Sequence, residues 1–164
     1  MTFFLAVDPG LYGAFALYDP NQVEKTRVID MPIKGSRVLP EGVAGVIISM
    51  EMRAALDPIK AVVERVGSMP RQKGAFNFGL STGVIHGALA ASGIPMELVT
   101  PSQWKPAMGL QKGPGETPED TKDRARALAA QLFPHMAEQF ARKKDDGRAE
   151  ALLLAVYYSN RRTL

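Results

Sequence analysis

The order of strand-like and helix-like segments is the feature that most restricts how this chain can fold. Apolar segments at residues 2–8 and 14–19 flank the turn sequence DPGLYG, which predicts a β-hairpin, and residues 26–33 predict a third strand. Apolar residues at helical spacing then predict a helix over residues 40–56. The apolar, β-branched segment at residues 59–66 predicts a buried fourth strand.

The second half of the chain combines further helices with one more strand. The sequence predicts a helix of small residues at 78–93, a fifth strand at 95–100 and a short helical or irregular piece at 102–108. Helices are expected at 120–133 and 149–160, where good helix formers dominate. Because the first three strands follow one another while the later ones are separated by helices, we expect an α/β fold. Its five-stranded mixed sheet, with the first three strands antiparallel, should be flanked by helices.

Length and composition restrict the class of protein further. A chain of 164 residues fits one domain, so we expect residues 1–164 to form a single unit. The absence of cysteine excludes structural disulfides and thiolate zinc sites, and it suits a reducing, cytoplasmic location. The net charge of +3 is only mildly basic. The longest apolar segment, residues 43–50, is far shorter than the ~20 residues that span a bilayer, and Asp8 interrupts the apolar N-terminus, so we expect neither a membrane partner nor a signal peptide.

Two carboxylates stand at the ends of apolar strands. Asp8 closes the first strand and precedes Pro9 and Gly10, so turn formation is the simpler interpretation of this residue. Glu64 interrupts the fourth strand, where a buried carboxylate is costly unless it is paired, bound to a metal or at the wet end of the strand. Pairing with Arg65 is disfavoured, because neighbouring strand residues point to opposite faces. Glu64 is therefore a candidate functional acid.

Three more acids precede the last predicted helix. Capping by a single acid is the simpler interpretation, but if Asp145 caps, the capping-box position falls on Arg148. If Asp146 caps, Glu150 comes one residue too late. Asp146 and Glu150 are four residues apart, so they share a helix face and repel each other. A bound divalent cation would remove this repulsion.

One arrangement explains all three acid locations. If the first and fourth strands are neighbours in the sheet, Asp8 and Glu64 lie side by side, and the last helix can bring Glu150 to them. Oxygen ligands favour Mg²⁺ or Mn²⁺ over zinc. A site with two such ions, about 3.5–4 Å apart, suits phosphodiester hydrolysis.

Several motifs taken together resemble a known nuclease family. The segments LAVDPGLYGAFAL, AVVERV, PSQWK, KDRARALAAQLFP and KKDDGRAEALLLA resemble, in this order, the RuvC-type Holliday junction resolvases of the RNase H-like superfamily, particularly the compact bacteriophage and prophage versions. The resemblance implies an RNase H-like fold. It also implies a homodimeric, Mg²⁺- or Mn²⁺-dependent endodeoxyribonuclease that acts in DNA recombination and repair. Such an enzyme nicks a four-way DNA junction symmetrically in two strands of like polarity.

The resemblance also assigns the site. It matches the family's first-strand, fourth-strand and closing-helix acids to Asp8, Glu64 and Glu150. The family often places a fourth ligand three residues before the closing acid, where this chain has Gly147. Asp146 is the preferred fourth ligand, and Asp145 is the alternative, better placed to cap the helix or to support a ligand.

Two lysines complete the implied catalytic residues. Lys105 in PSQWK and Lys122 in TKDRAR match positions that contact phosphate, and a lysine there can offset charge that builds up in the transition state. A solvent-exposed lysine is the simpler alternative for either residue. Trp104, the sole tryptophan, is interpreted as a core or hinge anchor rather than a base-stacking ring.

Junction binding is expected in the loop at residues 66–77, where basic side chains can contact phosphates and apolar ones can wedge against opened base pairs. The full set of expected DNA contacts is Arg65, Met69, Arg71, Lys73, Phe76, Lys105, Lys112, Lys122, Lys143 and Lys144. Glycines at positions 79, 83 and 87 form a smooth stripe for a dimer interface or for packing on the sheet. Neither His86 nor His135 clusters with a predicted site.

Alternative functions remain open at this point. An RNase H-like nuclease that acts on other branched DNA or on RNA–DNA hybrids would share the same acids, and a non-catalytic junction-binding module would share the same basic residues. An ATPase of the actin type begins with similar strands, but it needs two lobes, so we expect no nucleotide cofactor. If the protein is phage-encoded, its location is the cytoplasm of the bacterial host.

Overall fold

A five-stranded mixed sheet forms the centre of the molecule. A computed structural model describes residues 1–65, 67 and 74–162. The strand order is β3-β2-β1-β6-β7, which confirms the predicted mixed sheet, and the first and fourth predicted strands are neighbours, as the arrangement considered for the acids requires. The strands are β1 (Phe3–Val7), β2 (Ala14–Tyr18), β3 (Arg27–Asp30), β6 (Ile59–Glu64) and β7 (Met96–Val99).

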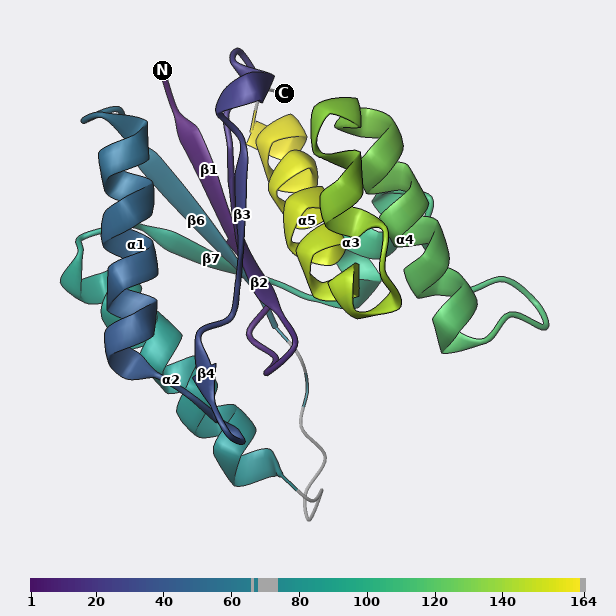
Figure 1. The fold of residues 1–164 in the computed structure, drawn as a ribbon, viewed down its shortest axis with the longest axis horizontal. Helices are drawn as coiled ribbons and strands as arrows, with labels where there is room; N and C mark the ends of the chain where they lie inside the picture. The colour runs from purple at the N-terminus through teal and green to yellow at the C-terminus, as the bar shows by residue number, and fades with distance from the viewer. Residues whose placement is uncertain (66, 68–73, 163–164) are drawn as a thin grey trace.

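Helices cover both faces of the sheet (Figure 1). One face carries α1 (Pro40–Ala54) and α2 (Ala75–Ala91). The other carries α5 (Asp146–Arg162), with α3 (Pro101–Ala107) and α4 (Pro118–Leu132) beside it. No helix in the described part of the chain is both long and apolar enough to cross a membrane.

The pairing of β1 sets which residues meet at each end of the sheet. β1 is antiparallel to β2, with Leu5 opposite Leu17, and parallel to β6, with Val7 opposite Val63. Because β1 and β6 are parallel, their C-terminal ends lie at the same edge. The residue directly after Val7 therefore lies beside Glu64.

Alternation along β1 produces two cores. Phe3 and Leu5 face α1 and α2, whereas Phe4 and Ala6 face α5, and all four side chains are buried. This explains why the strand is apolar throughout rather than alternating with polar residues. The central helix α5 is correspondingly apolar on most sides.

The start of α5 rests directly on the turn between β1 and β2. A Cβ added to Gly147 would lie 2.0 Å from the carbonyl oxygen of Tyr12 and 2.9 Å from Cα of Gly13. A Cβ on Gly13 would in turn lie 2.1 Å from the carbonyl oxygen of Asp8. Both positions need glycine because three pieces of backbone meet there.

Several element boundaries differ from those predicted. The third strand ends at Asp30, and a separate hairpin of β4 (Ile33–Lys34) and β5 (Arg37–Val38) follows it. α2 begins three residues early, so Phe76 lies in its first turn rather than in a loop. α5 also begins three residues early, because its polar first turn hides the start of the apolar pattern.

Short turns of 3-10 helix were not predicted. They are η1 (Val23–Lys25), η2 (Pro134–Phe140) and η3 (Lys143–Asp145), of which η3 leads directly into α5. α3 is a regular helix despite Pro106, and it begins with a capping box between Thr100 and Gln103.

Gly147→Ala is expected to destabilise the protein by about 1–3 kcal/mol, because the new methyl group would overlap the Tyr12 carbonyl and force α5 away from the turn. Urea unfolding monitored by circular dichroism measures this change. Gly45→Ala in α1 is the matched control, since a Cβ there meets nothing within 4 Å. Equal losses for the two variants would show that the close approach at Gly147 is not needed.

Candidate functional site

Two predicted acids lie side by side at the C-terminal edge of the parallel strands. Asp8 follows β1 directly, and Glu64 is the last residue of β6. Both have even residue numbers, and the even-numbered residues of β1 and β6 face the α5 side of the sheet. We therefore expect both carboxylates on that side. Asp8 also accepts a hydrogen bond from the backbone N–H of Gly10 at 3.3 Å, so the turn interpretation and the site interpretation hold together.

Glu64 is held in place by the sole tryptophan. The indole Nε1 of Trp104 donates a 2.8 Å hydrogen bond to Glu64 Oε1. Trp104 is fully buried and Glu64 is only 6% exposed, so this bond is sheltered from water. The sequence marked Trp104 as a core or hinge anchor, and no sequence signal linked it to an acid 40 residues away.

The third acid comes from α5. Glu150 lies one turn inside the helix, and its Oε1 accepts a 2.7 Å hydrogen bond from Nζ of Lys105. Because α3 carries both Trp104 and Lys105, this short helix contacts two of the acids at once. We call Asp8, Glu64 and Glu150 the acid cluster.

Electrostatics show that the acid cluster is compact. Burial, and after it the charges of Glu64 and Glu150, raise the pKa of Asp8 from 3.8 to about 7. The backbone bond from Gly10 and the charge of Lys105 only partly oppose these effects. Burial and the charge of Glu150 also raise the pKa of Glu64, against the bond from Trp104. The three carboxylates are therefore close enough to repel one another.

Asp146 and Lys122 form a second ion pair beside the acid cluster. Lys122 Nζ lies 2.5 Å from Asp146 Oδ2. This bond is the main cause of the raised pKa of Lys122, and the charge of Glu150 adds to it. Asp146 is the first residue of α5 and points toward α4, from which Lys122 comes.

Asp145 has a different set of partners. It is 2% exposed, and its carboxylate accepts hydrogen bonds from the backbone N–H of Arg142 at 3.0 Å and from the Arg142 guanidinium at 3.0 and 2.8 Å. These bonds form the capping box of η3 and hold the pKa of Asp145 below its usual value. Asp145 thus fixes the segment that leads into α5.

The side chains are of the type that hard cations bind, but they are not arranged as a metal-binding site. Among the described residues, no group of three or more His, Asp or Glu side chains is positioned to hold a metal ion. Lysine ammonium groups instead pair with Glu150 and Asp146. The donor set consists of carboxylates, which is what Mg²⁺ and Mn²⁺ prefer, so the residues fit such ions once the lysines move aside.

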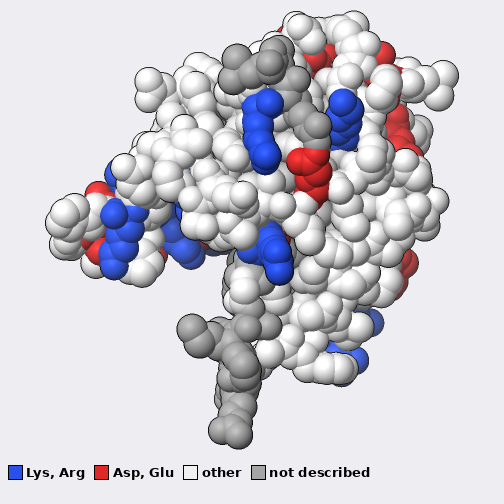
Figure 2. All heavy atoms as spheres, turned by 180° about the vertical axis from the view of Figure 1, so that it is seen from behind, with Lys and Arg blue, Asp and Glu red and all other residues white. Residues whose placement is uncertain are grey.

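The expected DNA contacts are spread over several elements. Arg65, Phe76, Lys112, Lys143 and Lys144 are exposed, whereas Met69, Arg71 and Lys73 lie outside the described residues. On the face shown in Figure 2, basic side chains form small separate groups with acids between them. The described residues of this face therefore form no continuous basic surface.

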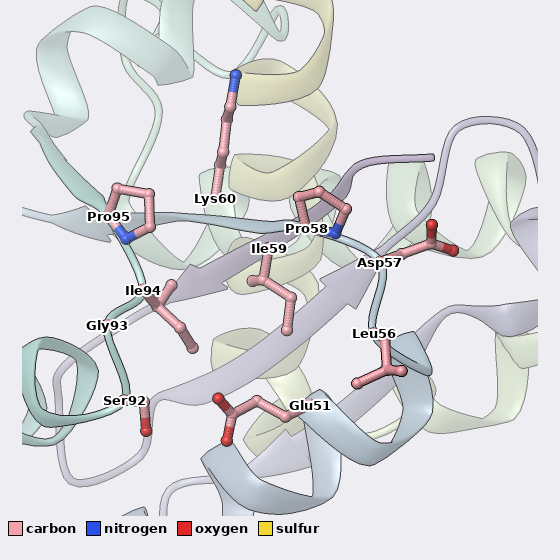
Figure 3. A pocket seen from close by; sticks show the side chains of 10 residues that line it. All are labelled: Glu51, Leu56, Asp57, Pro58, Ile59, Lys60, Ser92, Gly93, Ile94 and Pro95. Carbon is pink, nitrogen blue, oxygen red and sulfur yellow. The ribbon is translucent and has the colours of Figure 1, made fainter.

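A larger cavity lies at the opposite edge of the sheet. Its volume is about 420 Å³, and it is lined by the last turn of α1, the start of β6 with the residues that lead into it, and the connection between α2 and β7. In Figure 3 the carboxylate of Glu51 and the ammonium group of Lys60 point to different sides of the strands. Ligands of open α/β sheets bind at the carboxyl ends of the strands, so we assign no function to this cavity.

Asp8→Asn is expected to raise the melting temperature by a few degrees at pH 8 in the presence of a chelator, and to leave it unchanged near pH 4. The pKa of Asp8 is raised from 3.8 to about 7 in the folded protein, so its ionisation destabilises the fold. The wild type therefore loses stability as the pH rises from about 4 to about 7. Thermal unfolding across this range measures the effect. Glu138→Gln, at an exposed carboxyl of η2, is the control, and identical curves for Asp8→Asn and wild type would contradict a compact cluster.

Comparisons with known proteins identify the fold. No family model and no curated protein sequence matches the chain. Among solved structures, the chain is similar to Thermus thermophilus RuvC in complex with a Holliday junction substrate, with a TM-score of 0.63, 15% identity, and coverage of 98% of this chain and 96% of that one. A second Thermus thermophilus RuvC structure gives a TM-score of 0.57 at 18% identity, with coverage of 98% and 97%. The chain therefore has the fold of the RuvC-type Holliday junction resolvases.

Proposed function

We propose that this protein is a metal-dependent endodeoxyribonuclease that resolves four-way DNA junctions by paired symmetric nicks. The observation that carries the proposal is the convergence of Asp8, Glu64 and Glu150 from three separate elements at one edge of the sheet. Burying like charges together costs stability unless the site has a use for them. The similarity to the junction-bound RuvC structure supports a DNA junction as substrate.

The acid cluster would hold the metal ions. Asp8, Glu64 and Glu150 supply carboxylate oxygens for Mg²⁺ or Mn²⁺, and Trp104 orients Glu64. Two bound ions would supply an activated water and stabilise the leaving oxygen of the phosphodiester. The chain's own contribution is to fix the acids on rigid strand ends and a buried helix.

Asp146 is the better candidate for the fourth ligand. Its side chain points toward α4 and is paired only with the partly exposed Lys122. Asp145 is buried in the η3 capping box and would have to break three hydrogen bonds with Arg142 to reach a metal. An acid at position 147 is excluded by the Tyr12 carbonyl, which explains why the carboxylate lies one residue earlier.

The two lysines would act on phosphate. Lys105 and Lys122 now neutralise Glu150 and Asp146. When cations take over that task, the freed ammonium groups lie beside the site and can offset charge on the scissile phosphate. The exposed Arg65, Lys112, Lys143 and Lys144 would contact phosphates of the junction arms, and Phe76, at 82% exposure, would wedge against opened base pairs.

A second copy of the chain would complete the enzyme, because symmetric nicks in a two-fold junction call for two sites related by two-fold symmetry. The outer face of α2 fits such a contact. A Cβ on Gly79, Gly83 or Gly87 would meet nothing within 4 Å, so all three glycines face open space. Leu80, at 51% exposure, and Phe76 lie on the same helix. We therefore assign the glycine stripe of α2 to the dimer interface rather than to packing on the sheet.

Glu64→Gln is expected to slow the nicking of an immobile four-way junction by about 100-fold or more in Mg²⁺ or Mn²⁺, with junction binding unchanged. The amide oxygen can still accept the bond from Trp104, so only the charge is lost. Single-turnover cleavage of labelled junctions and gel mobility shifts measure the two quantities. A linear duplex and an RNA–DNA hybrid of matching sequence should be cut far more slowly than the junction.

Cation binding has a readout apart from cleavage, since Trp104 is the sole tryptophan. Mn²⁺ should quench its fluorescence in the wild type and much less in Glu64→Gln. Glu138→Gln should behave as wild type in every assay.

An RNA–DNA hybrid cut faster than the junction would make the substrate assignment wrong. A wild type that binds junctions but nicks nothing with either metal would favour the non-catalytic junction-binding module.

Gly83→Arg is expected to convert a wild-type dimer to a monomer that keeps its fold, because the new side chain enters open space in one subunit but blocks a facing copy. Light scattering during gel filtration gives the mass, and circular dichroism checks the fold. Gly45→Arg, in equally open space on α1, is the matched control and should remain dimeric. A monomeric wild type at micromolar concentration, or a dimeric Gly83→Arg protein, would refute the interface.

A further inference from the structure

The short hairpin of β4 and β5 stands at the same edge of the sheet as the acid cluster. β3 ends at Asp30, which pairs with Ala14 at the edge where Asp8 follows β1. The next residue, Met31, donates a 2.9 Å hydrogen bond from its backbone N–H to the carbonyl oxygen of Gly13, in the turn after Asp8. The β4–β5 hairpin therefore begins next to the turn that carries Asp8, and Figure 1 shows β4 beside α2.

Packing fixes the base of the β4–β5 hairpin. Met31 and Val38 are buried in the core that α1 and α2 cover. The backbone N–H of Leu39 donates to the carbonyl oxygen of Pro32 at 2.9 Å, which closes the hairpin at its base. A Cβ added to Gly42 would lie 2.6 Å from Cβ of Pro32, so the start of α1 packs tightly against this base. The tip thus projects from a well-packed support.

The tip of the β4–β5 hairpin carries two cations opposite each other. Lys34 pairs with Arg37 across the two strands, and both residues are exposed. Gly35, with a φ of 61°, allows the tight turn that joins them. Directly opposed residues have Cβ atoms about 5 Å apart, and like charges in such a pair destabilise the hairpin. The fold therefore holds together two side chains that repel each other.

No acid of the described residues forms an ion pair with Lys34 or Arg37. Asp30, four residues before Lys34, is bound through both carboxylate oxygens by Arg148 at 2.5 Å. Glu41, four residues after Arg37, lies in the first turn of α1 and does not pair with the hairpin. An anion from outside the chain would remove the repulsion and gain two charge-assisted contacts.

We propose that the β4–β5 hairpin binds the phosphate backbone of a duplex arm of the junction, with Lys34 and Arg37 on the phosphates. The inference rests on the proposed function, which supplies a DNA junction as substrate. The hairpin lies on the α1 and α2 side of the sheet edge and the acid cluster on the α5 side, so a duplex that crosses this edge would touch both. Such contacts position DNA without reading its sequence.

The length of the connection limits where the contact falls. The chain from Met31 to Lys34 spans at most about 10 Å. At about 3.4 Å per base pair, the hairpin would therefore reach phosphates within about five base pairs of the cut. The sequence-based set of DNA contacts contains neither cation, because the third strand was expected to run to residue 33 with no hairpin after it.

The salt dependence of junction binding in EDTA, where no cleavage occurs, tests this inference. Lys34→Gln combined with Arg37→Gln should weaken binding by about tenfold or more at about 0.1 M salt. It should also reduce the slope of log K against log salt by about 2, since each phosphate contact contributes about 0.9. Either single variant should reduce the slope by about 1, which gives the same test if the double variant does not fold.

The matched control combines Lys60→Gln with Arg161→Gln. It removes the same charge from two exposed residues near the start of β6 and the end of α5, at the opposite edge of the sheet. Its affinity and slope should equal those of the wild type. An equal loss in this control would show that only net charge matters, and it would overturn the hairpin site.

Ethylation of single phosphates in the junction locates the contact. Ethyl groups on an arm within about five base pairs of the cut should weaken binding by the wild type, and some of these should no longer affect the hairpin double variant. An unchanged salt slope in that variant overturns the hairpin site and leaves the nuclease standing. A wild type that never nicks, with the expected loss of slope in the variant, overturns the nuclease function and keeps the hairpin site. No junction binding by the wild type overturns both.

Discussion

The contact between the start of α5 and the turn after β1 is the constraint on which the site depends. Gly147 lets the helix backbone approach the Tyr12 carbonyl so closely that no side chain fits between them. Glu150, one helical turn further, is thereby carried to the ends of β1 and β6. Parallel pairing of these strands brings the other two acids together, but only this helix–turn contact adds the third.

Bringing these acids together causes electrostatic repulsion between their charges. Burial, followed by the charges of Glu64 and Glu150, raises the pKa of Asp8 to about 7, and two lysines on α3 and α4 neutralise acids of α5. Lys105 and Lys122 thus stabilise the protein when no cation is bound. The same ion pairs keep the acids in place, so the proposed cation binding would require an exchange of partners rather than a new fold.

The short helix α3 links the site to the core. Trp104 is fully buried and bonds to Glu64, while its neighbour Lys105 reaches Glu150. A helix of seven residues is therefore sufficient to orient one acid and to neutralise another.

The sequence by itself predicted the order of strands and helices along the chain and the mixed sheet, and it marked Asp8, Glu64 and Glu150 as candidate site acids. Apolar periodicity and turn residues are local signals, and a carboxylate such as Glu64 at the end of an apolar strand is conspicuous in any context. The start of α5 was missed because its polar first turn carries no apolar pattern, and the start of α2 was missed because Ala75 and Phe76 were assigned to the preceding loop, which contains several glycines and a proline. Only the tertiary structure separated Asp146, which pairs with Lys122 of α4, from Asp145, which is held by Arg142 three residues before it. The contact of Asp146 joins elements distant in sequence, and local propensity contains no information about such contacts.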